Sequence, residues 1–122
     1  VRTLALIAVI LFGFKFVYAK QIESEEKHLT ELFGDDTPVS SFKGHLGHTM
    51  AASGALESIA LVEMINRGCL IPTMKLENID DACSNIRHIC ELETTNIKTA
   101  IKNNFALGGI NSSLVIRRYK DD

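Results

Sequence analysis

The residues best suited to chemistry lie in one short stretch, where two histidines three positions apart follow a lysine: Lys43, His45 and His48. A long apolar segment comes next and predicts a helix that begins near Thr49. Because the positive end of the helix dipole and the nearby ammonium both disfavour imidazolium, we expect a neutral imidazole here. Such a ring can donate its N–H to a developing oxyanion, but a loop histidine that only caps the helix fits the pattern equally well.

A metal site is the other chemistry that these two histidines could support, with His28 as a third ligand. Histidine pairs at this spacing are common by chance, and no carboxylate or cysteine stands at a convincing distance from them. Cys69, Cys83 and Cys90 form no CxxC pair, so a structural zinc site is not indicated either. The sequence therefore predicts no metal and no other cofactor.

A glycine pair, Gly108 and Gly109, separates two predicted strands at residues 98–104 and 112–119. The pair lacks the known phosphate-loop patterns and precedes a strand rather than a helix. A glycine pair permits a tight turn or a close approach of the backbone to a substrate, and its N–H groups can form an oxyanion hole. We expect a hairpin here whose turn could carry a function.

The composition limits the class of protein. The chain has 122 residues, of which 46% are hydrophobic and 23% charged, with a net charge of −2. This length supports one small domain or half of a larger one. The composition excludes a disordered chain, a collagen-like repeat and a disulfide scaffold, and the absence of a basic block argues against nucleic acid as a partner.

The elements that must position these residues are helices and strands of an α/β protein. The predicted helix at 49–67 is apolar almost all round and ends at Gly68, so it needs cover on several sides, as in a larger protein or a tight oligomer. Residues 21–33 predict an amphipathic surface helix, 39–42 a short strand, and 69–85 an irregular crossover.

The first twenty residues form an apolar segment that we separate from residues 21–120. A basic start, an apolar run and a small-residue site near Ala19 fit a signal peptide. A buried parallel strand fits equally well by pattern, since β-branched and aromatic residues dominate. The run is too short and interrupted for a transmembrane helix, so a membrane partner is not expected. The downstream pattern favours the strand.

Two motifs together resemble one family. Residues 40–57, SSFKGHLGHTMAASGALE, are similar to the lysine–histidine block of the β-ketoacyl-ACP synthases, where ACP is the acyl carrier protein. Residues 103–114, NNFALGGINSSL, resemble their C-terminal loop NSFGFGGTNGSL. Between them, residues 68–73 and 76–83 resemble the family stretches GxIPPT and LDNPDEGC. The motifs occur in family order and spacing, and the resemblance covers about residues 21 to 118.

The resemblance implies a thiolase-like fold, in which two similar βαβαβαββ halves form a five-layer α-β-α-β-α sandwich. This chain would be most of the second half, with a mixed β-sheet packed against a buried central helix. It also implies a reaction. An active-site cysteine takes an acyl group, a malonyl thioester decarboxylates, and two histidines stabilise the enolate oxygen before the carbanion attacks the acyl-cysteine.

The resemblance also assigns site residues. His48 matches the second histidine of the family, and Lys43 matches the lysine that orients the histidines and sets the local charge. Glu57 matches a glutamate that organises the site, and the Leu107 backbone N–H matches an oxyanion-hole donor. His45 matches no required histidine. The supporting residues are Glu57, Phe105, Leu107, Gly108 and Gly109.

The sequence departs from the family pattern at several places. The nucleophilic cysteine belongs to the first half of the family fold, and no cysteine here lies in a nucleophile motif. The first catalytic histidine belongs to an HGTGTP motif that aligns with residues 14–19, where Phe14 cannot donate the hydrogen bond. Leu107 replaces a phenylalanine and Ala106 a loop glycine. Two of the three core catalytic groups are missing, so we expect the chain to be inactive by itself.

These observations predict the C-terminal part of a β-ketoacyl-ACP synthase, an acyltransferase for decarboxylative Claisen condensation in fatty acid or polyketide-type biosynthesis. The alternative is a non-catalytic remnant or interaction module on the same scaffold. The expected partners are ACP carrying acyl and malonyl thioesters, and an N-terminal synthase half or a homodimer partner. Because carrier-protein chemistry is cytosolic, the expected location is the cytoplasm rather than the exterior.

Overall fold

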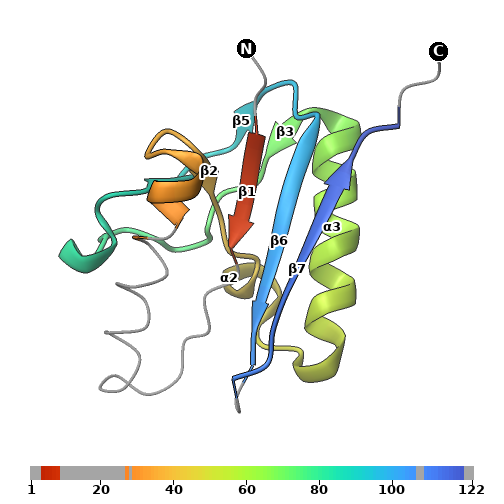
Figure 1. Ribbon diagram of the computed structural model, residues 1–122, viewed down its shortest axis with the longest axis horizontal. Coiled ribbons are helices and arrows are strands. Elements are labelled where there is room, and N and C mark those ends of the chain that lie inside the picture. Colours follow the sequence, from red (N-terminus) through yellow and green to blue (C-terminus); the bar gives the residue numbers. More distant parts are fainter. Residues whose placement is uncertain (1–3, 9–26, 28, 107–108, 120–122) are drawn as a thin grey trace.

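A mixed sheet of three strands forms the centre of the molecule. The computed structural model describes residues 4–8, 27, 29–106 and 109–119. Strand β6 (Thr99–Phe105) lies between β1 (Leu4–Ala8), which runs parallel to it, and β7 (Asn111–Arg117), which runs antiparallel (Figure 1). The predicted C-terminal hairpin is confirmed. Of the two interpretations of the first twenty residues, a strand is what Leu4–Ala8 forms.

Helix α3 (Ser53–Arg67) packs on this sheet against β6. It continues a 3₁₀ turn, η1 (Met50–Ala52), so the predicted start near residue 49 is confirmed. Gly68 ends the helix with φ +64, a conformation that glycine adopts without strain, and its N–H donates to the Met64 carbonyl. In the last turn Arg67 donates to Glu63 at 2.9 Å, and this hydrogen bond raises the pKa of the Arg67 guanidinium.

Short elements surround the sheet. Of the helix predicted at 21–33, residues 29–33 are helical and end at Gly34, while residues 21–26 and 28 lie outside the described residues. The remaining elements are β2 (Pro38–Val39), α2 (Lys43–Leu46), β3 (Cys69–Leu70), η2 (Asp81–Cys83), β4 (Arg87–His88) and β5 (Glu93–Thr94). Strand β2 pairs in parallel with β4, and β3 pairs with β5 in antiparallel orientation.

Two sequence-based expectations about these short elements need correction. The strand expected at 39–42 ends at Val39, because Phe42 already has helical dihedral angles as the N-cap of α2. The region expected to be irregular at 69–85 begins with a strand, β3, because its residues pair with β5, more than twenty positions later in the sequence. The division of the chain at residue 20 falls outside the described residues and stays a prediction.

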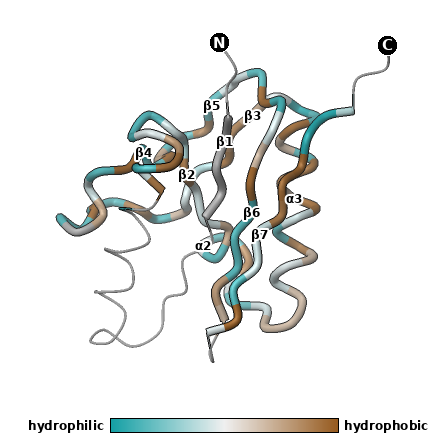
Figure 2. The backbone as a smooth tube through the Cα atoms, viewed as in Figure 1, coloured by the Kyte–Doolittle hydropathy of each residue, from teal (hydrophilic) through white to brown (hydrophobic). Residues whose placement is uncertain are grey.

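Hydrophobic side chains fill both sides of the sheet. Neighbouring residues of β6 contribute to different clusters, because successive side chains of a strand point to opposite faces. Ala100 packs in the larger cluster, which includes Leu61 and Met64 of α3. Ile101 packs against the smaller cluster of Val39 and Ile86. Figure 2 shows hydrophobic stretches of β6, β7 and α3 lying beside one another.

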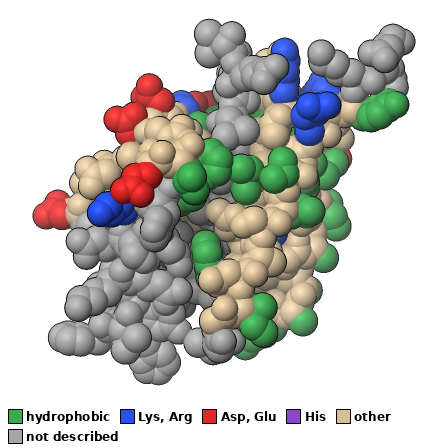
Figure 3. All heavy atoms as spheres, viewed as in Figure 1, with side chains coloured by type: hydrophobic (Ala, Val, Ile, Leu, Met, Phe, Trp, Pro, Cys, Tyr) green, Lys and Arg blue, Asp and Glu red, His purple; other side chains and the backbone are tan. Residues whose placement is uncertain are grey.

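Among the described residues, one face of α3 is buried. The buried residues follow helical spacing and are Ser53, Glu57, Leu61, Met64 and Ile65. The opposite face carries exposed apolar side chains, Leu56, Ile59 and Val62, along the flank where Figure 3 shows hydrophobic groups at the surface. A helix with apolar residues on both faces was expected to need cover on several sides, and this chain covers one of them. Within the described residues, no helix has the length and hydropathy needed to cross a bilayer.

Candidate active site

Helix α2 holds Lys43 by close packing against the loop after β3. A Cβ atom placed on Gly44 would lie 2.7 Å from the carbonyl oxygen of Met74, so only glycine allows this approach. His45 Nε2 lies 2.7 Å from the Pro72 carbonyl oxygen, to which its N–H donates. The histidine that was given no catalytic role thus anchors the helix that carries Lys43.

Lys43 and Glu57, which were assigned from separate motif positions, form a buried ion pair. Lys43 Nζ lies 3.3 Å from Glu57 Oε1, and the Glu57 side chain is 3% exposed. A third residue completes the group: Lys102 Nζ lies 2.9 Å from Glu57 Oε2. This second contact is an ion pair without the alignment of a hydrogen bond. Lys102 also donates to Asn104 Oδ1.

The three charged residues meet because of helix and strand periodicity. Ser53, Glu57 and Leu61 are spaced by four positions and so share the face of α3 that packs on β6. Lys102 was missed by the sequence-based interpretation. It stands two positions after Ala100, so both side chains lie on the same face of β6, beneath α3. This two-residue spacing from a buried alanine is the signal in the sequence that could have indicated the burial of Lys102.

His48 lies in the exposed loop between α2 and η1. The backbone N–H of Met50 donates to His48 Nδ1 at 3.0 Å. A nitrogen that accepts a hydrogen bond carries no hydrogen, so a neutral ring has its N–H at Nε2. Met50 has φ +50, an uncommon value for a residue with a side chain. No hydrogen bond of His48 Nε2 occurs within the described residues, so a neutral ring could donate its Nε2 hydrogen to a ligand.

The glycine loop closes the hairpin at the end of β6. Phe105 is the last residue of β6, and the N–H of Ala106 donates to the Ile110 carbonyl at 2.9 Å. Gly109 has φ +79, which glycine adopts freely. Leu107 and Gly108 lie outside the described residues, so the oxyanion-hole role of this loop stays a prediction.

The His48 loop and the glycine loop lie at the same end of the molecule. Figure 1 shows the start of α3 beside the turn of the β6–β7 hairpin. A Cβ atom placed on Gly54, in the first turn of α3, would lie 4.0 Å from the Asn104 side chain. Within the described part of the chain, no hydrogen bond or ion pair joins His48 to Lys43, Glu57 or Phe105. That His48 faces the same space as the loop stays a prediction.

The thiols and metal-binding side chains add no further site. Cys69 and Cys83 are half-buried, and Cys90 is exposed. Across residues 4–8, 27, 29–106 and 109–119, no three His, Cys, Asp or Glu side chains gather closely enough to hold a metal ion. Residues 14–19 and His28, which entered the sequence argument, lie outside these ranges.

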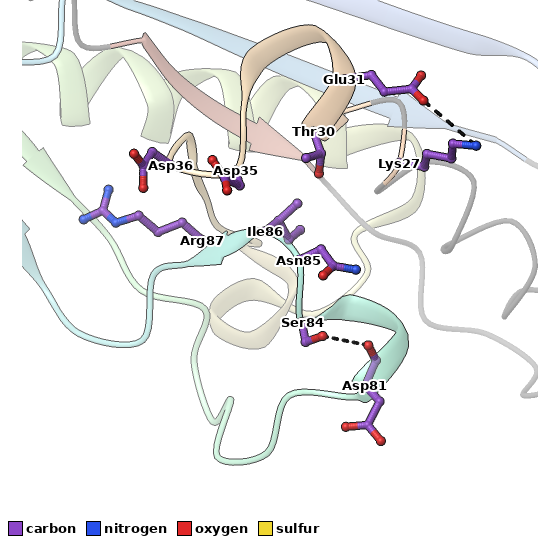
Figure 4. Close-up of a pocket in the computed structure, with 10 residues that line it drawn as sticks. All are labelled: Lys27, Thr30, Glu31, Asp35, Asp36, Asp81, Ser84, Asn85, Ile86 and Arg87. Carbon is purple, nitrogen blue, oxygen red and sulfur yellow. Dashed lines mark hydrogen bonds and ion pairs between the residues drawn. The ribbon is translucent and has the colours of Figure 1, made fainter.

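A pocket of about 770 Å³ opens elsewhere, between the helical residues at 29–33 and strand β4 (Figure 4). Its lining residues are mostly charged or polar: Lys27, Thr30, Glu31, Asp35, Asp36, Asp81, Ser84, Asn85, Ile86 and Arg87. Some of these groups already bind each other, since Ser84 Oγ donates to the Asp81 carbonyl at 2.9 Å. None of the predicted site residues lines this pocket.

Comparison with known proteins finds similarity to β-ketoacyl synthases. The family model described as "Beta-ketoacyl synthase, C-terminal domain" matches residues 21–77. The chain is 32% identical over 94 residues to 3-oxoacyl-acyl-carrier-protein synthase 1 of Escherichia coli, a match that covers 76% of this chain and 23% of that protein. The chain thus spans about a quarter of the length of the curated relatives that it matches.

Solved structures agree with the sequence matches. A β-ketoacyl synthase from Burkholderia phymatum superposes with a TM-score of 0.83 and 33% identity, covering 97% of this chain and 28% of that one. A ketosynthase solved in complex with its type II polyketide-synthase acyl-carrier protein gives a TM-score of 0.73 and 30% identity, covering 79% of this chain and 24% of that one. The sheet and the helix on it are therefore those of a partial thiolase-like fold.

Proposed function

The chain belongs to the β-ketoacyl synthase family and matches part of its C-terminal domain, and from this premise we propose that it supplies one side of a condensing-enzyme active site. The reaction is a decarboxylative Claisen condensation. An acyl group is held on a cysteine thiolate in a segment outside these 122 residues, and a malonyl thioester binds beside it.

His48 acts on the malonyl thioester in this proposal. When the malonyl carboxylate leaves as carbon dioxide, the electron pair of the broken bond moves toward the thioester carbonyl and forms an enolate. The Nε2–H of His48 donates to the enolate oxygen and stabilises its charge. The enolate carbon then attacks the acyl carbonyl, the new carbon–carbon bond forms, and the cysteine thiolate leaves.

Lys43 and Glu57 set the electrostatic potential of the site in this proposal. The ammonium of Lys43 brings positive charge to the side of the site where negative charge develops, and Glu57 fixes its position through the contact of 3.3 Å. The observation that carries the proposal is the meeting of these two motif residues in one buried ion pair, at the base of the loop that presents His48.

Acyl and malonyl groups on a carrier protein are the proposed substrates, in fatty acid or polyketide-type biosynthesis. The support is the name of the similar E. coli synthase and the solved ketosynthase in complex with its acyl-carrier protein. The rest of the synthase fold, or a second subunit, is the proposed protein partner. A cytoplasmic location is part of the same proposal.

The test supplies the missing nucleophile in trans. The full chain is mixed with a polypeptide that carries the N-terminal part of a similar synthase, and the loss of carbon dioxide from malonyl-ACP and formation of the condensation product are measured. We expect both reactions to require the two polypeptides together. A stable complex of the two that releases no carbon dioxide would contradict the proposal.

Matched histidine variants sharpen this test. His48→Ala removes a donor to the enolate oxygen and is expected to lower the decarboxylation rate about a hundredfold or more. His45→Ala is the control, because His45 donates to the Pro72 carbonyl and contacts the Phe42 ring at 6.3 Å between centroids. The control is expected to change the rate less than about tenfold. Equal losses in the two variants would remove His48 from the mechanism.

The second candidate is a non-catalytic interaction module on the same scaffold. The exposed apolar side chains of Leu56, Ile59 and Val62 favour it, because patches of this kind mark binding surfaces. A module of this kind needs no activated thiol, so iodoacetamide should label exposed Cys90 before the half-buried Cys69 and Cys83. A half-buried thiol that reacts far faster than Cys90 at neutral pH counts against this candidate.

A further inference from the structure

Lys102 is a charged side chain in the interior to which the proposed reaction gives no role. Its side chain is 1% exposed, on the face of β6 that α3 covers. Lysine is almost never fully buried unless it is paired. Two partners hold this one: Oε2 of Glu57 at 2.9 Å and Oδ1 of Asn104.

Glu57 therefore contacts two ammonium groups with its two oxygens. Oε1 lies 3.3 Å from Lys43 Nζ, while Oε2 lies 2.9 Å from Lys102 Nζ. One carboxylate carries a single negative charge, so the three side chains together keep a formal charge of +1. The shorter and fully buried contact is the one to Lys102, where solvent screening is weakest. The excess positive charge therefore lies with Lys43, which is 15% exposed.

The contacts of Lys102 also connect two parts of the candidate site, the glycine loop after β6 and helix α2 before His48. Asn104 stands directly before Phe105 at the end of β6, and its side chain approaches the first turn of α3 at Gly54. The chain of contacts runs from Asn104 through Lys102 and Glu57 to Lys43. It joins the base of the glycine loop to the helix that precedes His48.

We propose that Lys102 is a positioning residue: it binds Glu57 Oε2, fixes that carboxylate, and thereby leaves Lys43 with positive charge that no carboxylate fully neutralises. The meaning of this charge for condensation rests on the proposed function. The arrangement of the three side chains does not, so the two can fail separately. If Lys102 served only to fill space, its charge would not affect Lys43.

The test measures how fast the Lys43 amine reacts with acetic anhydride in the full chain, with each lysine followed by peptide mass spectrometry. Lys102→Met frees Glu57 to bind Lys43 with both oxygens, so acetylation of Lys43 is expected to slow about fivefold. Glu57→Gln releases Lys43 and is expected to speed it. In the double variant Lys102→Met has no further effect, because its influence passes through Glu57.

Internal controls come from the same chain. Exposed Lys75 and Lys98 report the general reactivity of the sample and should react equally in every variant that retains them. Lys98→Met is the matched control substitution, since it removes an exposed lysine just before β6 and should leave Lys43 unchanged. Circular dichroism checks that each variant is folded.

Two further variants keep the test decisive if Lys102→Met does not fold. Lys102→Gln has no charge but can still contact Asn104, and it must slow Lys43 acetylation in the same direction. Lys102→Arg keeps the charge and must stay within about twofold of the unmodified chain. Unchanged Lys43 reactivity in the neutral variants overturns the proposal. So does an arginine variant that behaves like them, or a Lys102→Met effect that persists without Glu57.

Discussion

The two faces of helix α3 differ in a way that hydropathy does not explain. The face on the sheet buries two polar residues, Ser53 and Glu57, beside Leu61. The opposite face leaves Leu56 and Ile59 in solvent, the latter 62% exposed. A charged residue such as Glu57 can be buried where it pairs with groups of opposite charge. Exposed apolar side chains such as Leu56 and Ile59 mark a surface that another polypeptide can cover.

The largest expected effect comes from the charge on the buried face. Glu57→Ala leaves two ammonium groups without their carboxylate and should lower the free energy of unfolding by about 4 kcal/mol, as measured by urea denaturation. Glu63→Ala is the control, because Glu63 belongs to the same helix but pairs with Arg67 in solvent. The control should lose no more than about 0.5 kcal/mol. Equal losses would mean that burial does not separate the two ion pairs.

An apolar residue of the buried face should rank second. Leu61 is fully buried in the larger cluster, so Leu61→Ala creates a cavity and should cost about 3 kcal/mol of unfolding free energy. The neighbouring residue offers a comparison, since Val62 is 40% exposed. Val62→Ala should cost less than about 1 kcal/mol in the same denaturation experiment. Similar costs at both positions would show that the outer face is covered in solution.

A hydroxyl at the start of the helix should matter less. Ser53 Oγ lies 3.0 Å from Thr49 Oγ1 and is buried, so Ser53→Ala should cost about 1 kcal/mol by thermal or urea unfolding. Ser58 is the control, because its Oγ only donates back to the Gly54 carbonyl within the helix. Ser58→Ala should be close to neutral. A costlier Ser58 variant would contradict this ranking.

The smallest effect on stability is expected on the outer face. Ile59→Ser exposes no new surface, so the free energy of unfolding should change by less than about 0.5 kcal/mol. If an added N-terminal synthase segment covers this face, the same substitution should weaken its binding about tenfold, because it removes an apolar contact. Unchanged affinity in a binding titration would place the partner elsewhere.

Long, patterned elements could be predicted from the sequence. The helix ending at Gly68 and the hairpin around Gly109 carry clear periodicity and glycine signals, and both form as expected. The first strand was ambiguous by pattern, since an apolar run fits a signal peptide or a strand. Its pairing with β6 comes from the far end of the chain, which no local pattern encodes.

The short strands and the second lysine could not be predicted in the same way. Two-residue strands such as β3 and β5 have no periodicity, and only their pairing across the fold defines them. Lys102 was missed because a lysine in a strand ordinarily indicates the solvent face. The alternation with Ala100 places Lys102 on the inner face of the strand, but a lysine is stable there only because of Glu57, which stands far away in sequence on another element.

The parallel pairing of β1 with β6 has a consequence for how the protein is made. Leu4 lies opposite Thr99, so β1 leaves the ribosome well before the strand with which it pairs. Contacts between such distant positions slow folding, because a long loop must close before they form. The β6–β7 hairpin needs only a short loop to close, so it is expected to form before β1 pairs with β6. The apolar segment of β1 therefore stays unpaired in the nascent chain until β6 has been synthesised.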